Sequence, residues 1–427
     1  IWGWASKNTT IKISTSWSNN KYTAKSNADG YWKLKISTPK ASFTPYSLNI
    51  SDGESITLKN VLIGEVWICS GQSNMEMPVK GYQTQPVQNS ADDILYSNNE
   101  GIRLFTVARA STLLPQEDCL GKLEVAGTRT VANFSATAYY FGRLINRVMN
   151  VPVGLINSSW GGASIQAWMS EKALETIPEK KIPKQEDEIK VKNQDATLLF
   201  NGMINPLVGY GIKGFIWYQG ETNRNEPDLY IRMFKEMVQE WRRIWGVGEF
   251  PVYYAQIAGF NYPDGINSAL IREAQAKCME IVPNTGMAVT LDSDSPYCIH
   301  PPQKKQVGER LAFWALNKTY GYKDIPCESP KIVKVEKEGR MIILTTNIPD
   351  KTWLTSYDRG VKAFVLAGEN KIFYPPKGAV LGNRIYLFSP RIAKPVTARY
   401  CFQHSSVSEI YSLEGNLPLS SFRLDDW

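Results

Sequence analysis

The chain has 427 residues, more than one hydrophobic core ordinarily serves, so we expect two or three domains. Hydrophobic residues make up 43% and charged residues 21%, and no apolar run approaches the roughly 18 residues of a membrane helix, which argues against a membrane-spanning segment in the printed sequence. The formal net charge of +7 comes from scattered basic residues, so nucleic acid is not an expected partner.

Residues 1 to about 62 alternate apolar and polar side chains with the period of β-strands. The alternation is clearest in Ile11–Ser14, Tyr31–Ile36 and Tyr46–Ile50. Asp29–Gly30 and Asp52–Gly53 lie between the strand-like segments and are typical of hairpin turns. We therefore expect residues 1–62 to form a small β-sandwich-like module.

The pattern then changes to short apolar runs separated by helix-like stretches. The expected strands include Val153–Ile156, Gly214–Tyr218 and Val252–Ile257, and the expected helices are Ser135–Met149, Tyr230–Trp245 and Ser268–Val282. This alternation predicts an α/β domain over residues 63–330, with a mainly parallel sheet covered by helices on both faces. Strand alternation returns from about Ile332, with a turn at Gly382–Asn383, and predicts a β-rich module over residues 331–427.

A serine turn follows the apolar run Val61–Cys69, which we expect to be one buried strand. In Gly71–Met75 the hydroxyl of Ser73 would lie at the carboxyl end of that strand, where open α/β sheets bind ligands. Met75 occupies the place of the second glycine of G-x-S-x-G, so the turn is not an α/β-hydrolase elbow. Ser73 is a candidate nucleophile, and a simple helix cap explains the segment equally well.

Two more polar segments follow predicted strands. Asn157–Ser164 contains Gly161 and Gly162, whose backbone amides could face an oxyanion, although a tight turn would need the same glycines. Gln219–Asn223 supplies side-chain amides that could donate to an oxyanion, although a polar helix cap is again an equal explanation.

A base for such a serine has few candidates, because the chain has only two histidines, His300 and His404. His404 falls in the C-terminal β-rich module, so we predict His300, in Ile299–Pro301, as the base. Two histidines and six cysteines without metal-ligand spacing predict no metal site, and without a phosphate-binding glycine loop we expect no cofactor.

The order of the four motifs, Gly71–Asn74, Trp160–Gly162, Gln219–Asn223 and Ile299–Pro301, resembles the SGNH (GDSL-like) hydrolase superfamily. More narrowly, the sequence is similar to the sialate O-acetylesterase family of carbohydrate esterases. Flanking segments agree with that family over nearly the whole chain, namely Gly64–Trp67, Glu76–Pro78, Phe134–Ala136, Gly415–Pro418 and Ser421–Arg423. The resemblance implies an SGNH-like three-layer α/β domain between two β-rich modules.

The resemblance also implies the roles of individual residues. Ser73 would be the nucleophile and His300 the general base, as in other serine esterases. The amides of Ser73 and Gly162 would hold the oxyanion, helped by a side-chain amide of Gln219 or Asn223. The reaction would pass through an acetyl-Ser73 intermediate that water hydrolyses.

One position departs from the family pattern. Superfamily members usually carry an aspartate two or three residues before the histidine, where this chain has Cys298 and Tyr297. Asp294 and Asp292 lie in the same segment, and either could orient the imidazole; a backbone carbonyl is a third possibility. We predict Asp294.

The predicted function is removal of O-acetyl groups from carbohydrates, with 9-O-acetylated sialic acid as the first substrate. A sialic acid carries a carboxylate, for which we predict Arg224, with Arg272 as a further possible contact. An acetyl xylan esterase and a non-catalytic carbohydrate-binding protein on a degenerate hydrolase scaffold are the alternatives. The resemblance suggests a secreted or periplasmic protein; Ile1–Trp4 reads as the middle of a strand, so we expect a removed leading segment.

Overall fold

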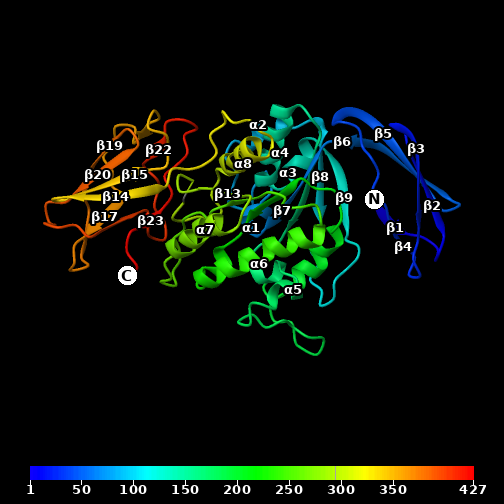
Figure 1. Cartoon of the computed structure of the whole chain (residues 1–427), viewed down its shortest axis with the longest axis horizontal. Helices are drawn as coiled ribbons and strands as arrows, with labels where there is room; N and C mark the ends of the chain where they lie inside the picture. Colours follow the sequence, from blue (N-terminus) through cyan, green and yellow to red (C-terminus); the bar gives the residue numbers. More distant parts are fainter. Residues whose placement is uncertain (294) are drawn as a thin grey trace.

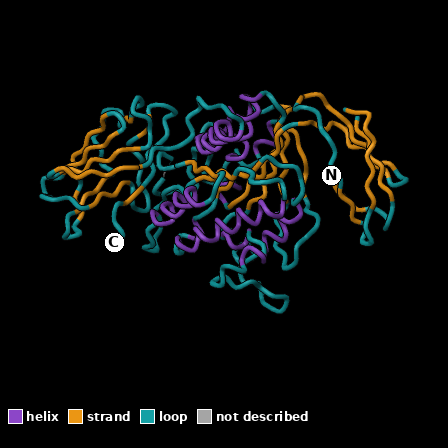
Figure 2. Tube along the Cα trace, viewed as in Figure 1, coloured by secondary structure: helices purple, strands orange, loops and turns teal. Residues whose placement is uncertain are grey.

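A computed structural model of the chain describes residues 1–293 and 295–427. Antiparallel strands from the start of the chain lie at one end of the molecule, a helix-covered sheet lies in the middle, and a second set of strands lies at the other end (Figure 1). Figure 2 shows that the helices lie beside the central sheet, whereas the two ends of the molecule consist of strands and loops. The expected fold class, an α/β domain with β-rich parts on either side, is therefore confirmed.

The N-terminal strands form two antiparallel sheets. One sheet has the order β3-β2-β5-β6, and β1 pairs with β4 in the other. Their bounds are β1 Trp2–Trp4, β2 Thr10–Thr15, β3 Ser18–Lys25, β4 Tyr31–Lys33, β5 Ser42–Ser51 and β6 Ser55–Ile63. The side chains of β2 alternate between buried and exposed, as the sequence pattern predicts.

Only one of the two predicted turns closes a hairpin. Asp52–Gly53 joins the paired strands β5 and β6, whereas the prediction for Asp29–Gly30 is wrong because β4 pairs with β1 and not with β3. Asn27 Oδ1 accepts from the N–H groups of Asp29 and Tyr31, each at 2.9 Å. This side-chain-stabilised turn directs the chain toward β1.

The run Val61–Cys69 is two strands, where we predicted one. β6 ends at Ile63 in the N-terminal sheet, and β7 (Glu65–Gly71) begins the central sheet. A Cβ on the intervening Gly64 would lie 2.1 Å from the Pro152 carbonyl oxygen. The two backbones therefore approach closely only because a glycine stands there.

The central sheet has the strand order β13-β12-β11-β7-β10-β8-β9 and is parallel except for β9, which pairs antiparallel with β8. The other strands are β8 Asn99–Val107, β9 Gly121–Ala126, β10 Val153–Ser159, β11 Gly214–Tyr218, β12 Val252–Ala255 and β13 Thr285–Ala288. The central strands β7, β10 and β11 end side by side, so the turns that follow them meet at one edge of the sheet.

Helices cover both faces of this sheet (Figure 1). α4 packs against α8 on one face, and α6 packs against α7 on the other. The helices are α1 Ser73–Glu76, α2 Ser90–Leu95, α3 Thr128–Ala132, α4 Ala136–Met149, α5 Glu171–Leu174, α6 Pro227–Trp245, α7 Ala269–Ile281 and α8 Lys304–Trp314. α6 starts three residues before the predicted Tyr230, because Pro227 suits the first helical turn.

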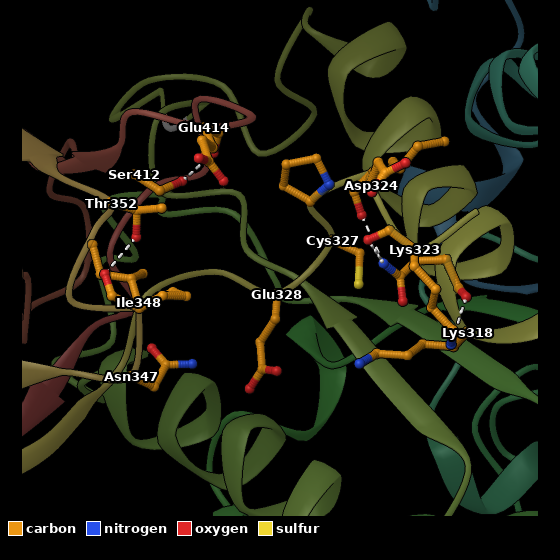
Figure 3. A pocket seen from close by; sticks show the side chains of 14 residues that line it. Lys318, Lys323, Asp324, Cys327, Glu328, Asn347, Ile348, Thr352, Ser412 and Glu414 are labelled. Atoms are coloured by element: carbon orange, nitrogen blue, oxygen red, sulfur yellow. Dashed lines mark hydrogen bonds between the residues drawn. The ribbon is translucent and has the colours of Figure 1, made fainter. Parts of the chain in front are cut away.

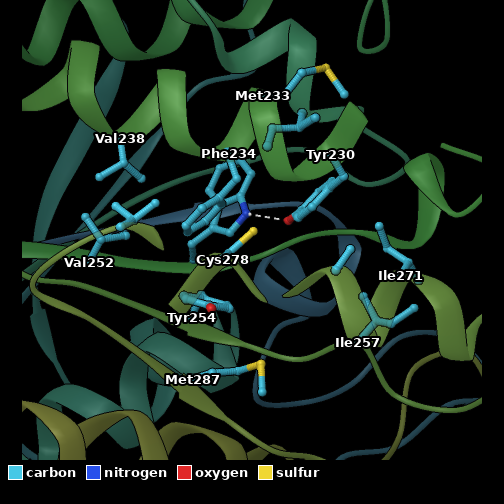
Figure 4. Close-up of a cluster of buried hydrophobic side chains, with 14 of the residues drawn as sticks. Tyr230, Met233, Phe234, Val238, Val252, Tyr254, Ile257, Ile271, Cys278 and Met287 are labelled. Carbon is cyan, nitrogen blue, oxygen red and sulfur yellow. Dashed lines mark hydrogen bonds between the residues drawn. The ribbon is translucent and has the colours of Figure 1, made fainter. Parts of the chain in front are cut away.

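The core under α6 is built from large apolar side chains. Figure 4 shows Tyr230, Phe234 and Val238 of α6 facing Val252 and Tyr254 of β12, with Cys278 of α7 between them. The hydroxyl of Tyr230 is not left unsatisfied, since it accepts from Trp217 Nε1 at 3.4 Å and donates to the Gln219 carbonyl at 3.1 Å. The apolar face of α6 is thus the buried one.

The C-terminal strands form three small antiparallel sheets. Their bounds are β14 Ile332–Glu338, β15 Met341–Thr346, β16 Leu354–Thr355, β17 Phe364–Ala367, β18 Phe373–Tyr374, β19 Lys377–Leu381, β20 Arg384–Phe388, β21 Thr397–Tyr400, β22 Tyr411–Ser412 and β23 Phe422–Arg423. Arg272, on α7, is fully buried and donates to the carbonyl oxygens of Cys401 at 3.0 Å and Gln403 at 2.5 Å. This arginine therefore ties the two parts of the chain together.

Candidate active site

Ser73 lies at the sharp turn between β7 and α1. Gly71 has φ +140°, and a Cβ there would lie 2.1 Å from the Tyr218 carbonyl oxygen, so the turn requires glycine. Ser73 is the first residue of α1 and is half-buried, while Asn74 and Met75 behind it are fully buried. Ser135 Oγ donates to the Met75 carbonyl at 2.5 Å and anchors the turn from α4.

The loop after β10 lies against the serine. A Cβ on Gly161 would be 3.4 Å from Ser73 Cβ, and the Gly161 N–H donates to Glu76 Oε2 at 2.8 Å. The Gly161 carbonyl accepts from Asn193 Nδ2 at 2.7 Å. Because N–H and C=O point in opposite directions across a trans peptide, the Gly162 N–H points away from Asn193.

Two backbone amides near the serine are the candidate oxyanion donors, that of Ser73 itself and that of Gly162 in the loop after β10. In the part of the chain that the structure describes, neither the Ser73 N–H nor the Gly162 N–H has a hydrogen-bond acceptor. Gly162 has φ +72°, and its carbonyl accepts from Thr222 Oγ1 at 3.2 Å and Gln194 Nε2 at 3.1 Å. Such preset, unoccupied donors suit a developing oxyanion.

The predicted side-chain donors are engaged within the protein. Gln219 Nε2 donates to the Ala163 carbonyl at 3.1 Å and to Asn223 Oδ1 at 2.7 Å. Asn223 Nδ2 donates to Gln166 Oε1 at 3.0 Å and to Glu226 Oε1 at 2.7 Å. Through these hydrogen bonds both side-chain amides stabilise the loop after β10.

His300 lies close to the serine turn. Tyr82 contacts both residues: its hydroxyl donates to the Ser73 carbonyl at 3.2 Å, and its ring packs edge-on against the imidazole with centroids 5.2 Å apart. His300 Nδ1 lies 2.6 Å from Gln85 Oε1. Burial, assisted by the positive charge of Lys304, lowers the pKa of His300 to about 4.

The two candidate acids have different outcomes. Asp294 lies outside the described residues. Asp292 faces Arg310, with a bidentate pair of 2.6 Å contacts, and also accepts from Gln306 Nε2 at 2.6 Å. The structure thus brings Gln85, a residue that the sequence motifs did not single out, to the imidazole.

A buried polar network underlies the site. Lys304 Nζ donates to Asn74 Oδ1 at 2.6 Å, and Asn74 Nδ2 donates to Glu221 Oε1 at 2.6 Å. Asn74 and Glu221 each belong to one of the quoted motifs. The only feature of the sequence that distinguished Glu221 was its acidic side chain within an otherwise neutral turn. Lys304 belongs to no motif, so the sequence pattern could not identify it.

Two arginines lie near the motifs. Arg224 forms a bidentate pair with Asp264 at 2.7 and 3.3 Å and stacks on Tyr262 at 3.3 Å from the ring centroid, which leaves 13% of its side chain exposed. Arg109 is 55% exposed and donates Nε and Nη2 to Glu76, whose other oxygen holds Gly161. The guanidinium of Arg109 lies over the Trp160 ring at 5.4 Å.

Other features of the molecule lie apart from these motifs. A groove of about 570 Å³ between the central domain and the C-terminal strands is lined by Lys318, Glu328 and Asn347 and by none of the candidate catalytic residues (Figure 3). Among the described residues, no group of three or more His, Cys, Asp and Glu side chains is placed to hold a metal ion. Within the same residues, no helix combines the length and apolar character needed to cross a bilayer.

Comparison with known proteins identifies the family. The family model described as "Carbohydrate esterase, sialic acid-specific acetylesterase" matches residues 63–317, more than half of the chain and all four motifs. The chain belongs to this family. It is therefore a carboxylic ester hydrolase that acts on acetylated carbohydrates.

Individual relatives agree with this assignment. The esterase is 28% identical to the sialate O-acetylesterase of Mus musculus, over 79% of this chain and 73% of the relative. It is 32% identical to the human sialate O-acetylesterase, over 66% of this chain and 58% of that protein. A crystal structure of a carbohydrate acetylesterase from Xanthomonas citri matches with a TM-score of 0.90 and 31% identity, over 100% of this chain and 95% of that one.

Proposed function

We propose that this esterase removes acetyl groups from O-acetylated sialic acid through an acetyl-Ser73 intermediate, with His300 as the general base. The observation that carries the proposal is the pair of unoccupied amides, Ser73 N–H and Gly162 N–H, beside a half-buried serine that Tyr82 links to His300. A serine with a base and a preset oxyanion site is the arrangement that acyl transfer requires.

The contact of the imidazole with Gln85 supports this assignment of His300. With Gln85 Oε1 as the acceptor, Nδ1 carries the ring proton and Nε2 is left unprotonated. His300 Nε2 takes the hydroxyl proton as Ser73 Oγ attacks the acetyl carbon, and it returns the proton to the departing sugar oxygen. In the second half-reaction, Nε2 activates a water molecule that releases acetate from Ser73.

The backbone amides of Ser73 and Gly162 would hold the negative oxygen of both tetrahedral intermediates. The side-chain amides of Gln219 and Asn223 remain predicted as further donors. In the ligand-free arrangement their N–H groups are directed to Ala163, Gln166 and Glu226, so a contribution to the oxyanion would require them to exchange a partner.

The surroundings of His300 set the expected pH dependence of the reaction. Only a neutral imidazole can accept the serine proton, and its pKa is lowered to about 4 by burial and by Lys304, so kcat/KM is expected to fall only below about pH 4. A profile of kcat/KM from pH 3 to 8 on a neutral acetate ester measures this decrease, which is the acid limb of the profile. Among the described residues, Tyr82 packs against the ring and the charge of Lys304 acts on it.

The variant Gln85→Glu is the matched test of this arrangement. A carboxylate 2.6 Å from Nδ1 would stabilise the imidazolium, so the acid limb is expected to move to higher pH. Asp294 stays the orienting acid predicted from the sequence, and Asp294→Asn is its test. A wild-type limb near pH 6.5 that moves downward in Asp294→Asn would assign the orienting role to Asp294, whereas an unmoved limb near pH 4 would assign it to Gln85.

The carboxylate of a sialic acid calls for a cationic contact. Arg224 is the predicted contact, but Asp264 and Tyr262 already engage it, whereas Arg109 is more exposed and its Nη1 has no partner among the described residues. We expect Arg109→Gln to raise KM for acetylated sialic acid about tenfold, the loss of one charge-assisted hydrogen bond. KM for a neutral acetylated sugar should change less than twofold; a selective loss in Arg224→Gln instead would favour the predicted contact.

The experiment that tests the function is acetate release from 9-O-acetylated sialic acid and from acetylated xylan. A higher kcat/KM for the sialic acid supports the proposal, and a higher value for xylan names the acetyl xylan esterase alternative. Binding of either glycan without acetate release would indicate a non-catalytic scaffold. A secreted or periplasmic location is part of the same proposal, and fractionation of the producing cells tests it.

A further inference from the structure

The ammonium of Lys304 lies at the centre of contacts that reach both reacting residues. Lys304 is the first residue of α8 and is fully buried; its Nζ donates to Asn74 Oδ1 at 2.6 Å and to the Pro301 carbonyl at 2.9 Å. Asn74 follows Ser73 in the chain, and Pro301 follows His300. One charged group thus bridges the backbone neighbours of the nucleophile and the base.

Asn74 extends this bridge. Its Nδ2 donates to the Ile299 carbonyl at 3.1 Å and to Glu221 Oε1 at 2.6 Å. The residues on both sides of His300, Ile299 and Pro301, are therefore held by Asn74 and Lys304. Gln85 fixes the ring of His300, but these contacts fix the backbone that carries it.

Stability alone does not account for a lysine at this position. The N-terminus of a helix is the positive end of its dipole, so a cation at the first residue of α8 is unfavourable. A buried ammonium and a buried carboxylate also lose their hydration, and apolar side chains of similar volume are often at least as stabilising. Burial lowers the pKa of Lys304 to about 7 and raises the pKa of Glu221, although each charge partly offsets the shift of the other.

Glu221 completes the network as the counter-ion. It is 6% exposed, and its Oε2 has no hydrogen-bond partner among the described residues. A network that breaks the rules of helix charge and of buried polar groups points to a site where geometry matters more than stability.

We propose that Lys304 is a positioning residue that holds Ser73 and His300 at reacting distance by tying their backbone neighbours into one buried network, with Glu221 as its counter-ion. The inference rests on the proposed function, since it takes Ser73 and His300 as the reacting pair. A displacement of about 1 Å between reacting groups can lower the rate on the order of 100-fold, so loss of the bridge should appear in kcat.

The test compares Lys304→Met with Lys305→Met, using 4-nitrophenyl acetate as a small neutral substrate. Lys305 is the next residue of the same helix, its side chain is 44% exposed, and it lies 3.8 Å from Asp93, so its loss controls for removal of a lysine from α8. We expect Lys304→Met to lower kcat by about 30- to 100-fold with KM changed less than threefold. Lys305→Met should stay within twofold of the wild type in both constants.

A second readout separates positioning from a general weakening of the fold. Removal of the Lys304 charge is expected to raise the pKa of His300, which moves the acid limb of kcat/KM to higher pH, while circular dichroism at the assay temperature stays that of the wild type. Because Lys304→Met leaves the Glu221 carboxylate without its counter-ion, the double variant Lys304→Met/Glu221→Gln is measured alongside it.

A folded Lys304→Met or double variant with kcat within threefold of the wild type would overturn the inference. The proposed function is judged separately: if Ser73→Ala keeps its activity, the proposed mechanism fails whatever Lys304→Met does. If Ser73→Ala is inactive and Lys304→Met is normal, only the positioning role is lost.

Discussion

Ser73→Ala is expected to lower kcat/KM for acetate release by about 10⁴-fold or more, and His300→Ala by a similar factor, because nucleophile and base act as one unit. The physical reason is that neither a hydroxyl without a base nor a base without a hydroxyl can form the acetyl-enzyme. The residual rate of each variant would come from substrate binding and from the Ser73 and Gly162 amides, which both substitutions leave in place. Acetate release measured over a range of enzyme concentrations checks this.

Non-additivity makes the test sharper. The double variant Ser73→Ala/His300→Ala should be no slower than the slower single variant, since each single change already abolishes the covalent route. His404→Ala is the matched control, because His404 is the other histidine and lies between β21 and β22, where its carbonyl accepts from Ser268 Oγ. Retention of more than a tenth of wild-type activity by Ser73→Ala would contradict the assignment of the nucleophile.

Arg310→Met is expected to lower the free energy of unfolding of the central domain by about 3–5 kcal/mol, the usual effect of leaving one partner of a buried ion pair alone. Arg310 and Asp292 are 4% and 7% exposed and meet in a bidentate contact. Arg310 also donates to the carbonyl of Val289, the residue after β13, at 2.8 Å, and the variant removes this hydrogen bond as well. Chemical denaturation followed by tryptophan fluorescence measures the change.

An exposed ion pair provides the control for this prediction. Lys172 on α5 and Glu175, the residue that follows this helix, are 63% and 56% exposed, and Lys172→Met should change the free energy of unfolding by about 0.5 kcal/mol or less. The double variant Asp292→Leu/Arg310→Met should be more stable than Arg310→Met, since no charge is then left buried without its partner. If Arg310→Met lowered the free energy of unfolding by less than about 1 kcal/mol, the prediction for this buried ion pair would be contradicted.

The fold class could be predicted from local pattern because helices and strands have different apolar periods. α4 begins at Ala136 with Ser135 as its cap, within one residue of the prediction, and α7 covers Ala269–Ile281 within the predicted Ser268–Val282. The errors fell where distant backbone decides: Gly64 ends a strand because Pro152 passes close to it, and the strand after Asp29–Gly30 pairs with β1. No local pattern carries that information.

The candidate site likewise contains residues that the sequence predicts and residues that it does not. Ser73, Gly162 and His300 follow from short motifs, because a nucleophile turn, an amide loop and a base each need particular residue types at particular spacings. Gln85, Asn193 and Lys304 lie outside the motifs, and a single polar side chain in a sequence does not indicate what it will contact. The residues alone therefore indicate the available chemistry and the family. Which neutral oxygen meets the imidazole, and which buried cation joins the serine turn to the histidine loop, depends on the folded chain, because those contacts join segments up to 230 residues apart.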